Sequence, residues 1–320
     1  MTTSATEGHR RDETAADVGA RVLRGVPAAA EIRERVAANV DDFRIRRGFS
    51  PTLAIVIVGQ EAASAVYLQQ ILRSCGLVGI PGRVVDLPAD SSAGDLERAI
   101  FELNDDPQVG GIIVQMPLPP WMPARTVVDS IAPEKDIDGI HPLNMGLMTL
   151  GYEGFLPACA EAAVHILKHG GFELEGRRAV VIGRSNVVGK PVQLLLIREH
   201  CTVSVCHRRT RDLVAEIERA DVVVVAAGSP GLVRGEMLKP GALVVDVGFN
   251  VVGDRIVGDV DYESAVPVAA AITPVPGGVG PVTNAILVEH LVRAARAQAD
   301  GSIHWPARRT SGVAHRSPPT

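Results

Sequence analysis

The chain has 320 residues, of which 46% are hydrophobic and 22% charged, and its formal net charge at pH 7 is −5. This length predicts two lobes rather than one core, and the composition excludes a disordered or fibrous chain. The acidic balance gives no sign of a nucleic-acid or membrane-surface partner. Four cysteines without CxxC spacing indicate neither a disulfide framework nor a zinc site, so we expect a cytoplasmic protein without a metal.

Both ends of the chain differ from the rest. The first 20 residues are polar and lack the apolar stretch of a secretory signal, and residues 301–320 are rich in Ser, Pro and Arg. We predict that residues 1–20 and 301–320 are disordered tails. Between them, the longest apolar runs have the length of a buried strand and are too short to span a membrane.

Strand-like and helix-like patterns alternate in the first half. We predict strands at Leu53–Val58, Arg83–Leu87 and Gly111–Gln115, with helices at Ala62–Cys75 and Leu96–Leu103. Such alternation is typical of a parallel sheet with helical crossovers. A loop-rich stretch, MPLPPWMPA and later APEKDIDGIHPLN, follows this series.

A second series of apolar runs begins near Ala179, with helical segments between the runs. We predict strands at Ala179–Ile182, Thr202–Cys206, Asp221–Ala226 and Leu243–Val247. Their spacing of roughly 20 residues favours βαβ units over a solenoid, because the segments do not resemble one another. The final segment, Thr283–Gln298, is predicted to be a helix that could pack back on the first lobe.

The first strand of the second series leads into a turn of the kind that holds the phosphates of a dinucleotide. The residues are Gly183-Arg184-Ser185, and Gly189 opens the following helical segment. Backbone N–H groups at a helix N-terminus face an anion, and glycine lets the backbone approach it. The pattern is not GxGxxG, so an ordinary strand–helix turn is an open alternative.

The next strand ends in CHRRT, with no carboxylate where an NAD-binding protein would hold the ribose hydroxyls. Arg208 and Arg184 instead place cations where the 2′-phosphate of NADP would lie. This arrangement favours NADP over NAD, with a solvated basic turn as the alternative.

At this point the sequence resembles a known family. The segments AVVIGRSNVVGKPVQLLL, CTVSVCHRRT, DVVVVAAGSPG, GALVVDVGFN, GDVDY and ITPVPGGVGPVT closely resemble the bifunctional methylenetetrahydrofolate dehydrogenase/methenyltetrahydrofolate cyclohydrolase family. LAIVIVG, the pair Ser64 and Tyr67, GGIIVQMPLP and PEKDIDGIHPLNMG agree in the first half. The resemblance covers residues 22–298 in the family's order and spacing.

The resemblance implies an α/β fold with a folate-binding lobe and a Rossmann-like NADP-binding lobe of parallel strands. Residues 21–156 with the helix 283–298 would form the folate lobe, and residues 157–282 the NADP lobe. The active site would lie in the cleft between them. The family's protomers usually form a homodimer, and its substrate is a folate of one-carbon metabolism.

The resemblance also implies roles for individual residues. Tyr67 would stack on the folate, Gln115 would line the reacting one-carbon unit, and Asp138 would accept hydrogen bonds from the pterin amino group. The loop over the substrate would contain Pro276, Gly277 and Gly280. NADP would contact Gly183, Arg184, Ser185, Arg208 and Phe249. Without this context, Tyr67 could serve packing alone, Asp138 could lie in a solvated turn, and the glycines could form only a tight loop.

Three positions depart from the family pattern. The family reads Tyr-x-x-x-Lys, but the fourth residue after Tyr67 is Ile71. Arg73 lies about 200° around a helix from Ile71 and would face elsewhere. Its guanidinium group is also too basic to exchange protons near pH 7, so Arg73 does not replace the lysine. PACAEA replaces the family's Pro-Cys-Thr-Pro-x-Gly at residues 157–162, and Val26 stands where the family usually has lysine.

These departures bear on two reactions differently. Oxidation of 5,10-methylenetetrahydrofolate to the methenyl form needs positioning and a hydride acceptor, but no proton transfer by a side chain. Hydrolysis of the methenyl form to 10-formyltetrahydrofolate needs a general acid/base, which isoleucine cannot supply. We therefore expect an NADP-dependent dehydrogenase with weak cyclohydrolase activity. A fully bifunctional enzyme rescued by Tyr67, Gln115 or water, and a non-catalytic folate- or NADP-binding paralog, are the alternatives.

Overall fold

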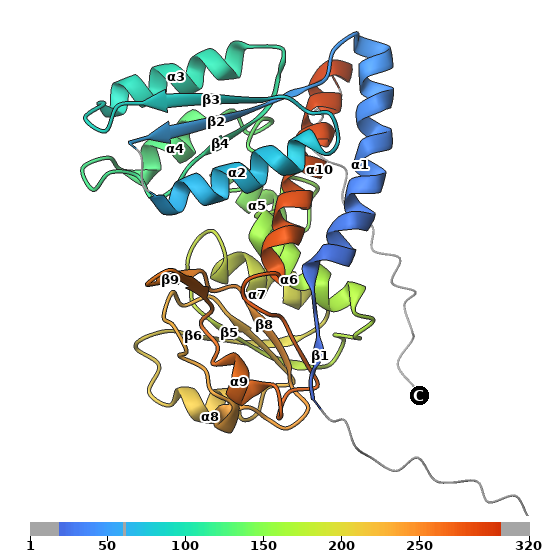
Figure 1. Cartoon of the computed structure of the whole chain (residues 1–320), viewed down its shortest axis with the longest axis vertical. Coiled ribbons are helices and arrows are strands. Elements are labelled where there is room, and N and C mark those ends of the chain that lie inside the picture. The colour runs from blue at the N-terminus through green and yellow to red at the C-terminus, as the bar shows by residue number, and fades with distance from the viewer. Residues whose placement is uncertain (1–18, 60–61, 302–320) are drawn as a thin grey trace, which may run out of the picture.

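Two parallel sheets organise the chain (Figure 1). The computed structural model describes residues 19–59 and 62–301, and for residues 62–67 it describes the backbone alone. The predicted tails lie outside the described residues, except for residues 19, 20 and 301. None of the described helices is long and apolar enough to cross a membrane.

The smaller sheet has three parallel strands in the order β3-β2-β4. These are β2 (Thr52–Val58), β3 (Gly82–Leu87) and β4 (Val109–Val114), joined by the crossover helices α2 (Ala62–Gly76) and α3 (Ala93–Asp105). The central strand β2 and the strand β4 are almost entirely buried, which agrees with their unbroken Val and Ile runs, whereas β3 is an exposed edge. All five elements predicted for the first half are confirmed.

The larger sheet has six strands in the order β1-β11-β8-β7-β5-β6, and every pair in it is parallel. The strands are β1 (Arg21–Val22), β5 (Arg178–Ile182), β6 (Thr202–Cys206), β7 (Val222–Val225), β8 (Leu243–Asp246) and β11 (Ala271–Ile272). The four predicted strands of the second series are confirmed. Strand β1 was not predicted, because two residues carry no periodicity.

Short elements connect and flank these strands. They are the helices α4 (Ala124–Ser130), α5 (Pro142–Leu150), α7 (Gly189–Arg198), α8 (Leu213–Ile217) and α9 (Tyr262–Ala265), the 3₁₀ turn η1 (Gly235–Met237), and the antiparallel pair β9 (Asn250–Val252) and β10 (Arg255–Val257). The prediction of a loop-rich stretch is wrong at the end of APEKDIDGIHPLN, where α5 begins. Its start is defined by His141, whose Nδ1 accepts a hydrogen bond from the Leu143 amide, and by Pro142 at the first helical position.

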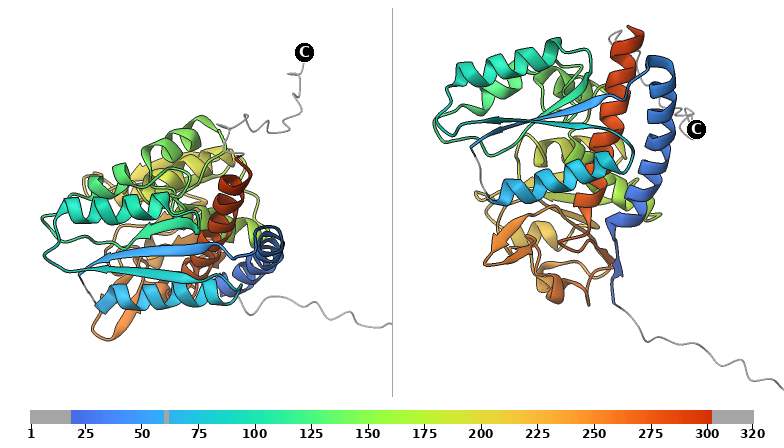
Figure 2. Two further views of the ribbon diagram at one scale, coloured as in Figure 1. Left: turned by 90° about the horizontal axis from the view of Figure 1, so that it is seen from above. Right: turned by 45° about the horizontal axis from the view of Figure 1, so that its top comes forward.

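Three helices contribute to the core that joins the two sheets: α1 (Gly25–Arg47), α6 (Ala158–His169) and α10 (Val279–Asp300). The views of Figure 2 show α1 and α10 side by side at the end of the smaller sheet where β2 begins. One continuous cluster of buried side chains runs from β2 through these helices to β5, β7 and β8. The final helix therefore packs back on the first lobe, as predicted, and also binds the two lobes into one core.

Lys135 shows how the loop before α5 is fixed to the smaller sheet. Its Nζ donates to the carbonyl oxygens of Leu103 at 3.0 Å, Asn104 at 2.6 Å and Asp106 at 2.8 Å, at the C-terminal end of α3. The residue is only 4% exposed, and burial lowers the pKa of its ammonium group. The cation thus satisfies carbonyl groups that the helix itself leaves without partners.

Lys135→Met should destabilise the protein, because it leaves these carbonyl groups near the core with no donor. We expect the free energy of unfolding to fall by about 2–4 kcal/mol in urea titrations. Arg125→Met is the matched control, since Arg125 forms an exposed pair with Asp129 and its loss should cost at most about 0.5 kcal/mol. Equal losses in the two variants would contradict this role of Lys135.

Candidate active site

The turn after β5 lies at the point where the strand order of the larger sheet reverses. The chain runs from β5 to β6 on one side and then crosses β5 to form β7 on the other. Ligands of open α/β sheets bind at the carboxyl ends of the strands at such a switch point. Gly183 follows β5 there with φ 122°, and a Cβ would collide with the Ala226 carbonyl oxygen after β7. Only glycine fits this close approach.

Ser185 organises the same turn. Its Oγ accepts hydrogen bonds from the amides of Val188 at 3.1 Å and Gly189 at 3.3 Å, where α7 begins. Gly189 is also required sterically, because a Cβ would strike the Gly183 carbonyl oxygen. The Ser185 side chain therefore holds the turn closed, and its own hydroxyl hydrogen is left to donate elsewhere.

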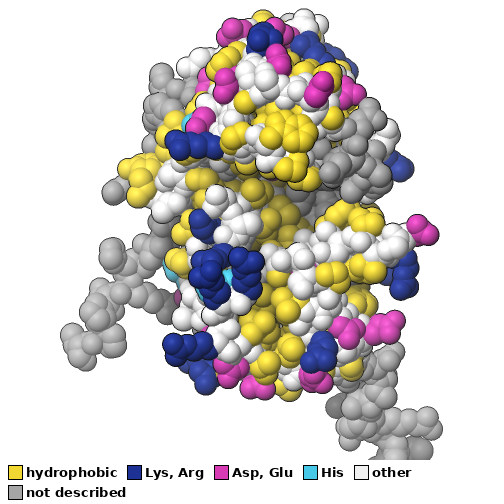
Figure 3. Space-filling view, turned by 90° about the vertical axis from the view of Figure 1, so that its left-hand side faces the viewer, with side chains coloured by type: hydrophobic (Ala, Val, Ile, Leu, Met, Phe, Trp, Pro, Cys, Tyr) yellow, Lys and Arg dark blue, Asp and Glu magenta, His cyan; other side chains and the backbone are white. Residues whose placement is uncertain are grey.

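Two arginines lie beside this turn. Strands β5 and β6 pair Ile182 with Cys206, so Arg184 and Arg208 each follow the strand end by two residues and share one edge of the sheet. Both are exposed, and neither forms an ion pair with a described carboxylate. Phe249, which follows β8 at the same edge, is 53% exposed. Figure 3 shows Lys and Arg side chains gathered on this lobe, beside a hollow that separates it from the other lobe.

Two buried carboxylates hold the neighbouring loops of the larger sheet. Asp259 accepts from the amides of Ala227, Gly228 and Ser229 at 2.6–2.9 Å, which fixes the loop after β7. Asp246, at the end of β8, accepts from the amide of Asp259 at 3.0 Å. Burial raises the pKa of Asp246 to about 6, although hydrogen bonds from the amides of Val260, Asp259 and Gly248 oppose the shift. Sequence reasoning did not assign these roles, although the two aspartates lie in the segments GALVVDVGFN and GDVDY.

On the other lobe, Gln115 follows β4 directly. Its amide N–H donates to the Val56 carbonyl at 2.8 Å, and its side-chain Nε2 donates to the Met116 carbonyl at 3.0 Å. Its Oε1 is buried and accepts no hydrogen bond from a described residue. A buried acceptor without a donor is uncommon and favours a binding role for this side chain.

The two acidic residues of KDIDG have different environments. Asp136 is fully buried and accepts from the amides of Ile140 at 3.1 Å and His141 at 2.8 Å, and from Asn144 Nδ2 at 2.8 Å. Asp138 is half-buried and accepts no hydrogen bond from a described residue. Asp136 therefore shapes the loop, and Asp138 is the carboxyl group left available for a ligand.

Asp138 lies beside the starts of α6 and α10. Gly139 packs against the Leu156–Pro157 peptide that precedes α6, where a Cβ would not fit. Burial raises the pKa of the Cys159 thiol to about 12, a hydrogen bond with Thr283 opposes the rise, and the charge of Asp138 adds to it. No described side chain caps α6 at Pro157.

The loop before α10 reaches the same region. Gly277 has φ 103°, its carbonyl accepts from the Gly25 amide at 2.9 Å, and Pro276 and Gly280 are exposed on either side. The structure thus brings this loop together with the start of α1. Ile71 of α2 is 1% exposed and belongs to the core that the two lobes share, so its position offers no proton donor or acceptor. The Tyr67 side chain lies outside the described residues.

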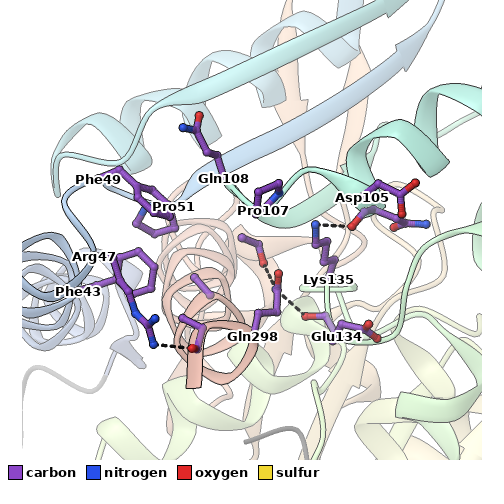
Figure 4. Close-up of a pocket in the computed structure, with 14 residues that line it drawn as sticks. Phe43, Arg47, Phe49, Pro51, Asp105, Pro107, Gln108, Glu134, Lys135 and Gln298 are labelled. Atoms are coloured by element: carbon purple, nitrogen blue, oxygen red, sulfur yellow. Dashed lines mark hydrogen bonds between the residues drawn. The ribbon is translucent and has the colours of Figure 1, made fainter. Parts of the chain in front are cut away.

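A separate pocket of about 480 Å³ opens at the opposite end of the smaller sheet (Figure 4). It is lined by residues that precede β2 and β4, such as Pro51 and Gln108, whereas Gln115 follows β4. Lys135, Arg47 and Gln298 in its wall all donate to groups of the chain itself. Nothing in this pocket calls for a polar ligand. Among the described residues, no three His, Cys, Asp or Glu side chains are grouped so that they could hold a metal.

Comparison with known proteins gives consistent matches in both lobes. Residues 23–138 match the catalytic domain of tetrahydrofolate dehydrogenase/cyclohydrolase, and residues 157–299 match its NAD(P)-binding domain. The chain is 46% identical over 278 residues to the bifunctional protein FolD of Moorella thermoacetica, which covers 87% of this chain and 99% of that protein. It is 45% identical over 287 residues to FolD of Bordetella petrii, covering 89% and 97%.

Solved structures agree. The N5,N10-methylenetetrahydrofolate dehydrogenase-cyclohydrolase of Trypanosoma brucei, complexed with NADP and an inhibitor, has a TM-score of 0.85 at 36% identity and covers 88% of this chain and 99% of its own. FolD of Campylobacter jejuni has a TM-score of 0.82 at 41% identity, covering 86% and 98%.

The environment of Asp138 predicts a pH-dependent contribution to stability. Burial raises its pKa to about 7, and the Asp136 carboxylate adds to the rise. An unfolded aspartate has a pKa of about 3.9, so the stability that the proton provides is complete below pH 4 and is lost as the pH rises through 7. Asp138→Asn removes this loss.

The difference in the free energy of unfolding between Asp138→Asn and the parent should therefore rise by about 2–4 kcal/mol between pH 4 and pH 8. The lower value applies because water that reaches the carboxyl group weakens the effect. Urea titrations across this range measure the difference. Asp90→Asn, at an exposed position, is the control and should show no such trend. A difference that stays constant with pH would show that Asp138 is not desolvated.

Proposed function

The chain belongs to the tetrahydrofolate dehydrogenase/cyclohydrolase family, and from this premise we propose that it oxidises 5,10-methylenetetrahydrofolate to 5,10-methenyltetrahydrofolate with NADP in one-carbon metabolism. One observation supports the proposal above the others. Asp138 and Gln115 Oε1 on one lobe accept no hydrogen bond from a described residue, and Arg184 and Arg208 at the switch point of the other lobe form no ion pair with a described carboxylate. A folate presents amide and amino donors, and NADP presents phosphates.

We assign the cofactor side to the turn after β5. Arg184 and Arg208 would hold the 2′-phosphate, since both guanidinium groups are exposed at one edge and have no described carboxylate partner. Gly183 would let the backbone approach the dinucleotide, Ser185 would donate its hydroxyl hydrogen, and Phe249 would cover the cofactor. When bound, NADP accepts the hydride.

We assign the folate side to the loops after β4 and before α10. Asp138 would accept from the pterin amino group, and Gln115 would lie against the one-carbon unit. Tyr67 would stack on the folate, and Pro276, Gly277 and Gly280 would close over it. These residues would orient the substrate and exclude water. The methenyl cation is stabilised by its own nitrogens, so positioning is the main requirement for the oxidation.

Hydrolysis of the methenyl product places another demand on the site. A proton must reach the departing nitrogen, and loss of a general acid/base costs about 10²–10⁴-fold in rate. Ile71 is 1% exposed within an apolar core, so it cannot take this role. We therefore propose that the cyclohydrolase activity expected of the family is weak here. A fully bifunctional enzyme, with Tyr67, Gln115 or water moving the proton, and a non-catalytic binding paralog remain the alternatives that the assays distinguish.

The parent protein should hydrolyse 5,10-methenyltetrahydrofolate near the buffer rate, as followed by the loss of methenyl absorbance. Ile71→Lys should raise this rate by about tenfold or more if the pocket admits the lysine. If Ile71 only fills a dry core, the new charge should instead destabilise the protein without activity. Gln70→Lys, on the exposed neighbouring residue, controls for the added charge. Fast hydrolysis by the parent would contradict the proposal.

We further propose that the protein is a cytoplasmic homodimer. All four cysteines lie among the described residues and are free, which fits a reducing compartment. Strand β3 is an open edge of the smaller sheet. Val84 is 41% exposed and lies on the same face of β3 as Gly82, which lies next to Leu72 of α2. The opposite edge, β4, is covered, since the Ile112 amide donates to the Lys135 carbonyl. A second copy would complete the β3 edge.

Light scattering should give the parent a mass of about twice 33.8 kDa. Val84→Lys should weaken association by about tenfold or more, because a charge on an edge strand opposes pairing. Val214→Lys, at a residue 39% exposed on α8 of the other lobe, should leave the dimer intact. A monomeric parent would contradict the dimer, and an unaffected Val84→Lys dimer would exclude this edge.

A further inference from the structure

His290 of α10 lies where three segments of the chain meet. It is 2% exposed, and its Nδ1 lies 2.8 Å from the carbonyl oxygen of Ile137, in the KDIDG loop. Its Nε2 lies 3.1 Å from Oε2 of Glu161, in the first turn of α6. The ring of Phe155 packs against the imidazole, with ring centroids 5.5 Å apart. Neither His290 nor Glu161 has a role in the reaction described above.

His290 connects two segments through its two ring nitrogens. A carbonyl oxygen only accepts, so Nδ1 donates to Ile137. Burial raises the pKa of Glu161, but its hydrogen bond with His290 and the charges around it lower the pKa overall. The imidazole is therefore held at one end by the first turn of α6 and at the other by the KDIDG loop.

The loop bond reaches the peptide group that joins Ile137 to Asp138. Asp136 holds the other end of the loop through the amides of Ile140 and His141. Asp138 itself accepts no hydrogen bond from a described residue, so the backbone on either side of it determines where its carboxyl group points. One of these two anchors is Asp136, and the other is His290.

We propose that His290, held by Glu161, is a positioning residue that orients the Asp138 carboxyl group for the folate. The inference rests on the proposed function for the identity of the ligand. Since α6 packs against α7 of the larger sheet, the same pair ties the folate loop to the other lobe.

The test compares two replacements of His290. His290→Leu removes both hydrogen bonds and should raise the KM for 5,10-methylenetetrahydrofolate about tenfold or more, while the Kd for NADP stays within about twofold. His290→Asn keeps an N–H near Nδ1 and should hold the KM within about threefold of the parent. His169→Leu is the matched control, because His169, the last residue of α6, forms an exposed pair with Glu31 of α1. It should behave as the parent.

An unchanged folate KM in folded His290→Leu would overturn the proposal, and so would equal changes in the folate KM and the NADP Kd, which indicate general damage. Should His290→Leu not fold, Glu161→Gln carries the test. It keeps an acceptor but removes the charge, so the folate KM should rise about threefold or more. No rise would overturn the proposal.

A measurement without folate separates this inference from the proposed function. Amide hydrogen exchange of residues 138–141 should be about tenfold faster or more in His290→Leu than in the parent, and near the parent rate in His290→Asn. Unchanged exchange would show that His290 does not hold the loop. A parent that fails to oxidise the folate but shows this pattern would contradict the proposed function alone.

Discussion

The burial of α10 between two sheets is the constraint on which the rest of the structure depends. Thirteen of its 22 residues are buried, on every side of the helix, because it packs against α1, α6 and the smaller sheet at once. The cluster that it joins continues into the larger sheet, so the two lobes share one core. The apolar area removed from water in this core stabilises the packing by about 25 cal/mol per Å². The packing fixes the carboxyl ends of the strands of one sheet relative to those of the other. The same packing determines the positions of the loop before α10 and of the start of α6.

Within this frame, buried carboxylates shape the loops. Asp136 and Asp259 each accept three or more hydrogen bonds, mostly from backbone amides, and their loops have one conformation as a result. Asp138 has no such partner among the described residues, and its pKa is raised. Two aspartates of one short motif therefore differ in role because one is satisfied by the backbone and the other is not.

Much of the fold could be predicted from the sequence. Strands such as β2 and β7 are continuous runs of apolar or β-branched residues, and the close approach at Gly183 follows from a glycine at a strand end. Strand β1 could not be predicted, because its two residues pair with β11 only through tertiary contact. The start of α5 was missed because His141 is an uncommon cap. The different roles of Asp136 and Asp138 depend on burial, which the periodicity of the sequence does not reveal. The bond from His290 to Ile137 joins residues more than 150 positions apart, and periodicity does not reveal such a contact either.

NADP-linked oxidation of the folate without a general acid/base is tested most directly by initial rates of cofactor reduction at 340 nm. With 5,10-methylenetetrahydrofolate as substrate, kcat/KM for NADP should exceed that for NAD by about tenfold or more, and Arg184→Ala should lower the NADP value while changing the NAD value little. Equal values for the two cofactors, or no folate-dependent reduction of either, would contradict the account.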